Sequence, residues 1–177
     1  VWLPDTFHIP GDNRDRFMIA KAPFELERDT FLRAIEFIPG NRRGVHHMNG
    51  AMISYAPGAK RDNNADTGYI DSDSTKSLDA YGDLKLQNDD GTWPLLTPNM
   101  VNYLPGLSPP MYPPGIGGYR IEKEGAFLMN TLHYGPSLID TIDHSHFNLW
   151  FTDTPPERPM QELALGTLGM STIVPPL

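Results

Sequence analysis

Short apolar runs, separated by turns that contain proline or glycine, recur along most of the chain. Apolar and polar residues tend to alternate within these runs, and no 3.6-residue periodicity persists beyond about ten residues. The pattern predicts strands over 2–10, 17–20, 31–38, 45–55, 119–121, 125–134 and 144–151. We therefore expect residues 1–177 to form a single all-β domain, an antiparallel β-sandwich or jelly roll with long irregular loops.

A strong turn signal, Pro39-Gly40-Asn41, separates two of these predicted strands. The strands on either side, 31–38 and 45–55, are both apolar and partly alternating. Two strands joined by a tight turn commonly pair with each other, so this stretch predicts an antiparallel hairpin.

Three stretches depart from the strand pattern. Residues 61–92 hold eight aspartates among Ser, Asn and Gly, which predicts an acidic, solvated insertion loop. An EF-hand is not expected there, because Lys76 stands where such a calcium loop needs glycine. Residues 93–118 are rich in Pro and Gly, which disfavours long helices and central strands and predicts an irregular segment. Residues 160–177 form an apolar tail.

Composition narrows the classes of partner and cofactor. The net charge is −8 and no large basic patch offsets it, which argues against nucleic acid and anionic membranes as partners. The chain has no cysteine, which excludes disulfides, thiolate zinc sites and blue copper. No segment approaches the roughly 20 apolar residues that a membrane-spanning helix needs.

Three histidines form the main candidate site. His46 and His47 open the predicted strand 45–55, and His133 lies near the end of the strand 125–134. Three neutral imidazoles are a suitable ligand set for copper or zinc. Adjacent strand residues point to opposite faces, so His46 and His47 can share an ion only where the strand begins, bends or bulges. Gly44 supplies that freedom; otherwise one histidine packs inside and the other faces solvent.

His144 and His146 form a second candidate metal site. They are two residues apart on a predicted strand, so they project from the same face, and Asp140 or Asp143 would complete a ligand set. The plainer interpretation, a polar start to a strand, is favoured. Zinc at the three-histidine site would imply hydrolytic chemistry, for which no positioned general base is evident.

The segment Phe37–Met48 (FIPGNRRGVHHM) resembles the stretch that carries paired histidines in the copper type II, ascorbate-dependent monooxygenases, the family of peptidylglycine α-hydroxylating monooxygenase. The segment Leu132–Gly135 (LHYG) resembles the strand that donates the third histidine of the same domain. Members of this family have paired β-sandwiches with one copper in each. The resemblance implies that His46, His47 and His133 bind the electron-transferring copper.

The resemblance lies in residues 30–55 and 105–152, and the acidic loop and both ends of the chain are unmatched. The second domain, which holds the oxygen-activating copper, has no counterpart, and the family's disulfides are absent, so a complete enzyme is not expected. We expect a periplasmic or secreted copper-binding domain that acts in electron transfer or copper handling with a protein partner. The alternative is a non-catalytic accessory subunit of a larger extracytoplasmic or membrane-associated complex, with a vestigial or structural metal site.

Overall fold

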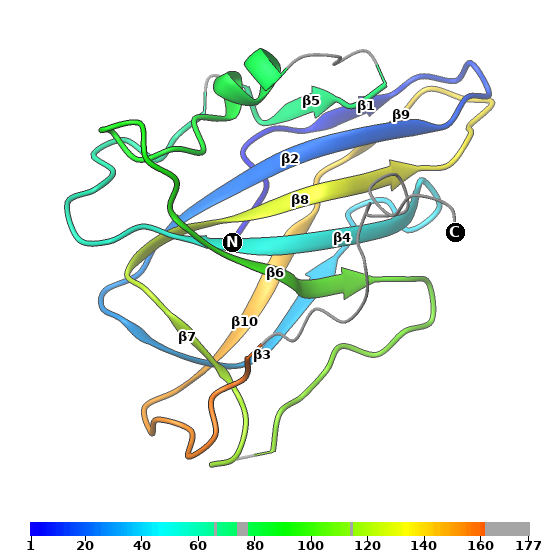
Figure 1. Ribbon diagram of the computed structural model, residues 1–177. Helices are drawn as coiled ribbons and strands as arrows, with labels where there is room; N and C mark the ends of the chain where they lie inside the picture. Colours follow the sequence, from blue (N-terminus) through cyan, green and yellow to red (C-terminus); the bar gives the residue numbers. More distant parts are fainter. Residues whose placement is uncertain (66, 74–77, 114, 162–177) are drawn as a thin grey trace, which may run out of the picture.

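The computed structural model describes residues 1–65, 67–73, 78–113 and 115–161, and these form three antiparallel sheets (Figure 1). The all-β sandwich predicted from the sequence is confirmed. Most of the apolar tail, residues 162–177, lies outside the described residues. In chain order the elements are β1 (Phe7–Ile9), β2 (Arg16–Glu25), β3 (Thr30–Ile38), β4 (Val45–Ser54), β5 (Tyr69–Asp71), η1, a 3₁₀ helix (Leu78–Leu84), β6 (Leu95–Tyr103), β7 (Tyr119–Ile121), β8 (Glu124–Tyr134), β9 (Thr141–Asp143) and β10 (His146–Thr152).

Two sheets form the sandwich and enclose the main core. The larger has the strand order β5-β2-β8-β4-β6, and the smaller has the order β10-β3-β7, while β1 and β9 pair beside them. Apolar side chains alternate along the central strands, so one face of each sheet is apolar and the two apolar faces bury each other. The contact is direct at Phe127 of β8 and Phe147 of β10, whose ring centroids lie 4.7 Å apart.

The predicted hairpin between residues 31–38 and 45–55 is wrong. Both strands form, but β3 belongs to the smaller sheet and β4 to the larger one, so the chain crosses between the sheets at residues 39–44 (Figure 1). The reason lies in Gly40, where an added Cβ would come 2.5 Å from the carbonyl oxygen of His144. The turn therefore packs against the chain between β9 and β10 and does not fold β4 back onto β3.

A buried carboxylate fixes this crossing. Asp143 is only 1% exposed and accepts hydrogen bonds from the backbone N–H of Asn41 (2.7 Å), the hydroxyl of Tyr134 (2.9 Å) and the hydroxyl of Ser145 (2.7 Å). Asn41 in turn accepts a hydrogen bond from the N–H of Gly44 through its side-chain oxygen (3.0 Å). Asp143 therefore ties the start of β4 to the end of β8, the two places where the candidate metal ligands lie.

The segment 61–92 differs from the solvated loop that its aspartates predicted. It contains β5 and η1, and it buries Ile70, Leu84 and Leu86 against Ile53 of β4. The residue before Ile53 on β4 belongs to the main core, and adjacent strand residues point to opposite faces of a sheet. This second apolar cluster therefore lies on the outer face of the larger sheet. The Pro-rich segment 93–118 likewise contains a strand, β6, although it is an edge strand, as its prolines require.

Candidate metal centre

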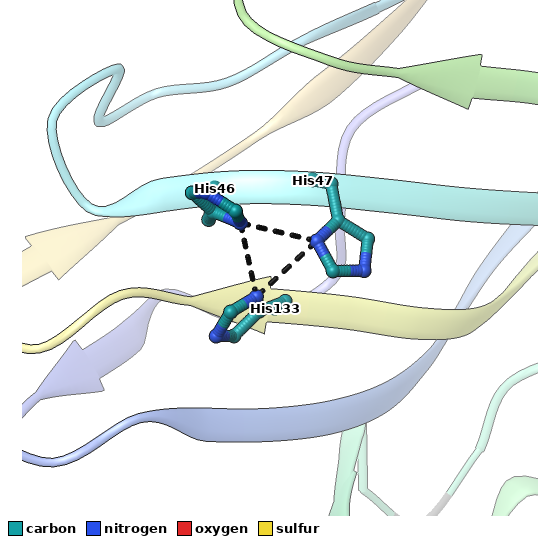
Figure 2. A group of neighbouring side chains, drawn as sticks. All are labelled: His46, His47 and His133. Carbon is teal, nitrogen blue, oxygen red and sulfur yellow. Dashed lines mark hydrogen bonds between the residues drawn. The ribbon is translucent and has the colours of Figure 1, made fainter.

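His46, His47 and His133 come together where β4 begins and β8 ends (Figure 2). In the antiparallel pairing, His47 lies opposite His133 and Val45 lies opposite Tyr134. The chain advances two residues on β4, from Val45 to His47, while it advances only one on β8, between Tyr134 and His133. His46 is therefore the extra residue of a β-bulge. The bulge turns the side chain of His46 toward that of His47. Two adjacent strand histidines need such an irregularity in order to share one ion.

The three imidazoles converge through the same ring atom. The Nδ1 atoms of His46, His47 and His133 form a triangle with all three sides 3.2 Å long (Figure 2). Among the described residues, this is the only cluster of three or more histidine, aspartate or glutamate side chains whose ligand atoms lie close enough to hold one ion. The three-histidine group expected from the sequence is therefore present as a geometric unit.

The triangle cannot satisfy itself by hydrogen bonding. In a neutral imidazole each Nδ1 is either a donor or an acceptor. With three atoms and two roles, at least two of the nitrogens must have the same role and face each other unfavourably at 3.2 Å. A cation placed among three lone pairs removes this conflict, because each nitrogen then acts as a ligand. The donor arrangement therefore fits a bound metal ion better than it fits a metal-free cluster.

The size of the triangle also fits first-row metals. Separations of 3.2 Å between the nitrogens are compatible with metal–nitrogen bonds of about 2.0–2.1 Å to one shared ion. His46, His47 and His133 would hold the ion through Nδ1, and a further ligand would complete a four-coordinate set.

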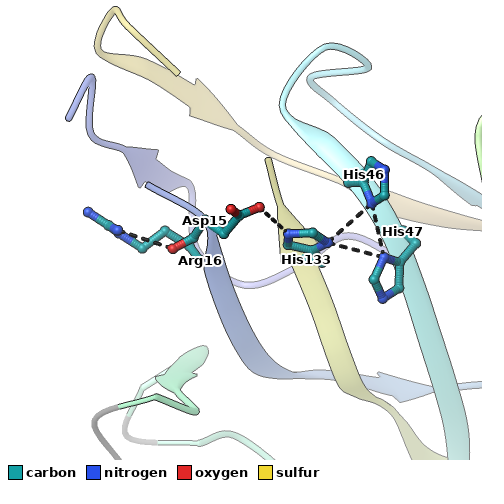
Figure 3. A network of polar contacts seen from close by, with 5 residues as sticks. All are labelled: Asp15, Arg16, His46, His47 and His133. Carbon is teal, nitrogen blue, oxygen red and sulfur yellow. Dashed lines mark hydrogen bonds and ion pairs between the residues drawn. The ribbon is translucent and has the colours of Figure 1, made fainter. Parts of the chain in front are cut away.

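Asp15 and Phe17 contact the ring of His133 away from the triangle of nitrogens, Asp15 at the Nε2 edge and Phe17 on the ring face. The Nε2–H of His133 donates a hydrogen bond to Oδ1 of Asp15 (2.6 Å), as Figure 3 shows. This assignment leaves the lone pair on Nδ1, the atom that faces His46 and His47. Phe17 of β2 lies opposite His133 in the sheet and stacks on its ring, with centroids 4.2 Å apart and planes 11° apart.

The electrostatics favour the form of the site that binds metal. Burial, followed by the neighbouring His133 and His46, lowers the pKa of His47, so this imidazole is neutral at neutral pH. The cluster nevertheless reaches the surface: His46 is exposed and His47 is half-buried, while His133 is 9% exposed. A ligand or a partner protein therefore has access to the side of the site formed by His46.

The second candidate site does not assemble in the same way. His144 uses its Nε2 to contact the carbonyl oxygen of Leu3 (2.9 Å), and the ring of His146 packs on Trp2 with centroids 4.2 Å apart. Among the described residues, no third ligating side chain completes a group with this pair. Both histidines instead pack around Trp2, whose ring also lies 5.0 Å from that of His144.

The contacts of Asp15 and Phe17 with His133 were not predicted from the sequence. Asp15 lies two residues before the predicted strand 17–20, a position typical of a turn residue, and Phe17 has the character of an ordinary apolar strand residue. Only the pairing of β2 with β8 brings both to His133. An available signal was that metal-bound histidines commonly donate their other ring N–H to a carboxylate, which justifies searching strand ends for one.

Neither a protein-family model, nor a curated protein, nor a solved structure matches this chain. In the part of the chain that the structure describes, no helix has the length and apolar content needed to cross a bilayer. Function is therefore inferred from the geometry of the metal centre, together with the family resemblance of the two histidine segments.

Proposed function

We propose that this protein is a copper-binding β-sandwich domain that exchanges single electrons with a protein partner through the centre formed by His46, His47 and His133. The observation that carries the proposal is the triangle of Nδ1 atoms, which brings three imidazole nitrogens close enough to hold one ion. All-imidazole ligand sets suit copper and zinc. A bound copper ion would supply one-electron redox chemistry.

The residues around the centre support redox chemistry over hydrolysis. A zinc hydrolase needs a general base near the open position. The carboxylate nearest to the ligands along their hydrogen-bond network, Asp15, lies on the Nε2 side of His133, on the opposite edge of the ring from the triangle. Within the described residues no further acidic ligand atom joins the three nitrogens. Among the described residues, the three histidines would therefore hold a metal with no carboxylate ligand beside them to act as a base.

Three features suit the site to electron exchange at a surface. The ring of His46 is exposed, so a partner can approach within contact distance of the centre. The pairing of β4 with β8 and the stacking of Phe17 limit movement of the ligands between oxidation states. With three protein ligands, a bound copper would have room for one exchangeable ligand besides the histidines. A periplasmic or secreted location is part of the proposal and rests on the family resemblance alone.

Copper loading followed by spectroscopy tests the redox role. The Cu(II)-loaded protein should give an electron paramagnetic resonance spectrum with nitrogen hyperfine structure, which a chemical reductant abolishes and air restores over several cycles. His8→Ala provides a matched control, because His8 is an exposed histidine on β1 outside the cluster. A protein that binds copper but loses it on each reduction would contradict electron transfer. A protein with no stoichiometric copper would favour the accessory-subunit alternative.

A further inference from the structure

Arg33 of β3 occupies another β-bulge, in the half of that strand remote from the loop that leads to the metal centre. In the pairing of β3 with β10, Leu32 lies opposite Phe151 and Ala34 lies opposite Trp150. Arg33 is thus an extra residue between two pairs that are consecutive on β10. Bulges of this kind commonly redirect a side chain near a functional site, and here the redirected side chain is a cation.

Arg33 lines a cavity of about 400 Å³. The walls come from the segment before β7 and from the chain around the end of β10, which lie together at the lower end of the molecule in Figure 1. The volume lies in the range of small-molecule sites. The residues that line it, besides Arg33, include Gly115, Gly117, Phe151, Thr152 and Thr154.

Arg33 has no counter-charge in this cavity. Within the described part of the chain, its Nε is buried without a hydrogen-bond partner, and its guanidinium forms no ion pair. The nearest acid along β10, Asp153, is exposed and pairs with Arg28 at 2.9 Å. The chain has net charge −8 and therefore many carboxylates, yet none of those in the described residues pairs with this half-buried cation. Partly buried charges are normally paired, so the cavity is incomplete without an anion.

We propose that this cavity is a binding site for a small oxyanion, a carboxylate or a phosphate group. A guanidinium presents parallel N–H donors that match two oxygens of such a group. The hydroxyl of Thr154 makes no hydrogen bond among the described residues and stands at the rim as a further donor. Gly115, with φ of +76°, lets the backbone approach a ligand without a side chain in between.

One wall of the cavity is apolar and favours a ligand that carries more than its charge. Phe151 is 45% exposed, a large fraction for an aromatic ring, and it lines the same space as Arg33. A ligand whose oxyanion contacts Arg33 can place an apolar portion against this ring. The site shares no residue with the metal centre, so this proposal stands or falls separately from the proposed copper chemistry.

Nuclear magnetic resonance of the ¹⁵N-labelled protein tests the site directly. The Nε–Hε signal of Arg33 reports on the buried, unpartnered donor itself, and the amide of Gly117 reports on a second residue that lines the cavity. Titration with sodium acetate and with inorganic phosphate, against sodium chloride as a salt control, should shift both signals saturably, with a dissociation constant of about 1 mM or tighter for at least one oxyanion. The tighter of the two anions identifies the ligand class.

Two variants and one control sharpen the test. Arg33→Met should weaken oxyanion binding at least about tenfold. Arg33→Lys keeps the charge but not the paired donors, so its affinity for the oxyanion should lie between those of Arg33→Met and the wild type. Arg61→Met removes an exposed guanidinium that pairs with Asp89 elsewhere and should change nothing. Dispersed spectra establish that each variant is folded. No saturable shift at about 50 mM of either anion, or an equal response from Arg33→Met, overturns the proposal.

Discussion

Replacing Asp15 by asparagine should weaken metal binding at the three-histidine centre without abolishing it. The carboxylate accepts the Nε2–H of His133 at 2.6 Å and so keeps the lone pair of Nδ1 directed at the ion. Asparagine has nearly the same shape but carries no charge. The three ligands themselves are untouched, so the change isolates the orienting hydrogen bond from the metal–nitrogen bonds.

The magnitude follows from the geometry and the exposure of the pair. A hydrogen bond to a charged group contributes about 1.5–3 kcal/mol, and loss of such partners typically reduces metal affinity about 10–100-fold. The side chain of Asp15 is 51% exposed, although that of His133 is only 11% exposed, so water screens the charge. The lower part of the range applies, and we expect a loss of about tenfold.

Competition titration with a chromophoric copper chelator measures this change for Asp15→Asn beside the wild type. Asp12→Asn is a suitable control, because Asp12 is a nearby exposed carboxylate that pairs with Arg16 and not with a histidine. Equal affinities for Asp15→Asn and the wild type would refute the role of Asp15. A loss as large as that of His133→Ala would instead mean that the variant no longer forms the site.

Two further predictions concern the protein without metal. Burial lowers the pKa of His47 below its unfolded value of about 6.5, so the unfolded chain takes up the proton first as pH falls. The contribution of neutral His47 to stability is therefore complete well above pH 6.5 and is lost as pH decreases from about 6.5 through the lower folded pKa. Urea titrations between pH 8 and 5 should show this decline, and His47→Ala should flatten it. Asp143→Ala should destabilise the fold by about 3 kcal/mol, because it leaves three donors, two of them buried hydroxyls, without their shared acceptor. Chemical denaturation measures the loss, and a change below about 0.5 kcal/mol would contradict the role of this carboxylate as the anchor of the crossing.

The strands could be predicted because alternation and turn residues are local signals. Residues 125–134 and 45–55 became β8 and β4 almost unchanged. The partner of each strand is set by packing at a distance, which is why the hairpin prediction was wrong. Gly40 and Asn41 have the local sequence of an ordinary turn. The packing of that turn depends on Asp143, about a hundred residues further along the chain, which accepts the N–H of Asn41.

The candidate site also combines features that local sequence indicates with features that depend on strand register. Two adjacent histidines beside a glycine indicated a bulge, and the structure places one at His46. The role of Asp15 depends on the register between β2 and β8, which no local pattern encodes. Arg33 was equally hidden, since an arginine within an alternating strand usually faces water. The prediction of a solvated loop at residues 61–92 gave too much weight to its aspartates, because a few apolar residues such as Ile70 and Leu84 suffice to hold the segment on the sheet.

Metal content tests the central claim most directly. Elemental analysis of the purified protein after copper loading and removal of excess should give about one copper per chain. His133→Ala should lose it, whereas His8→Ala, the matched control on β1, should retain it. An equal metal content in all three proteins, or none in the wild type, would contradict a copper centre built from His46, His47 and His133.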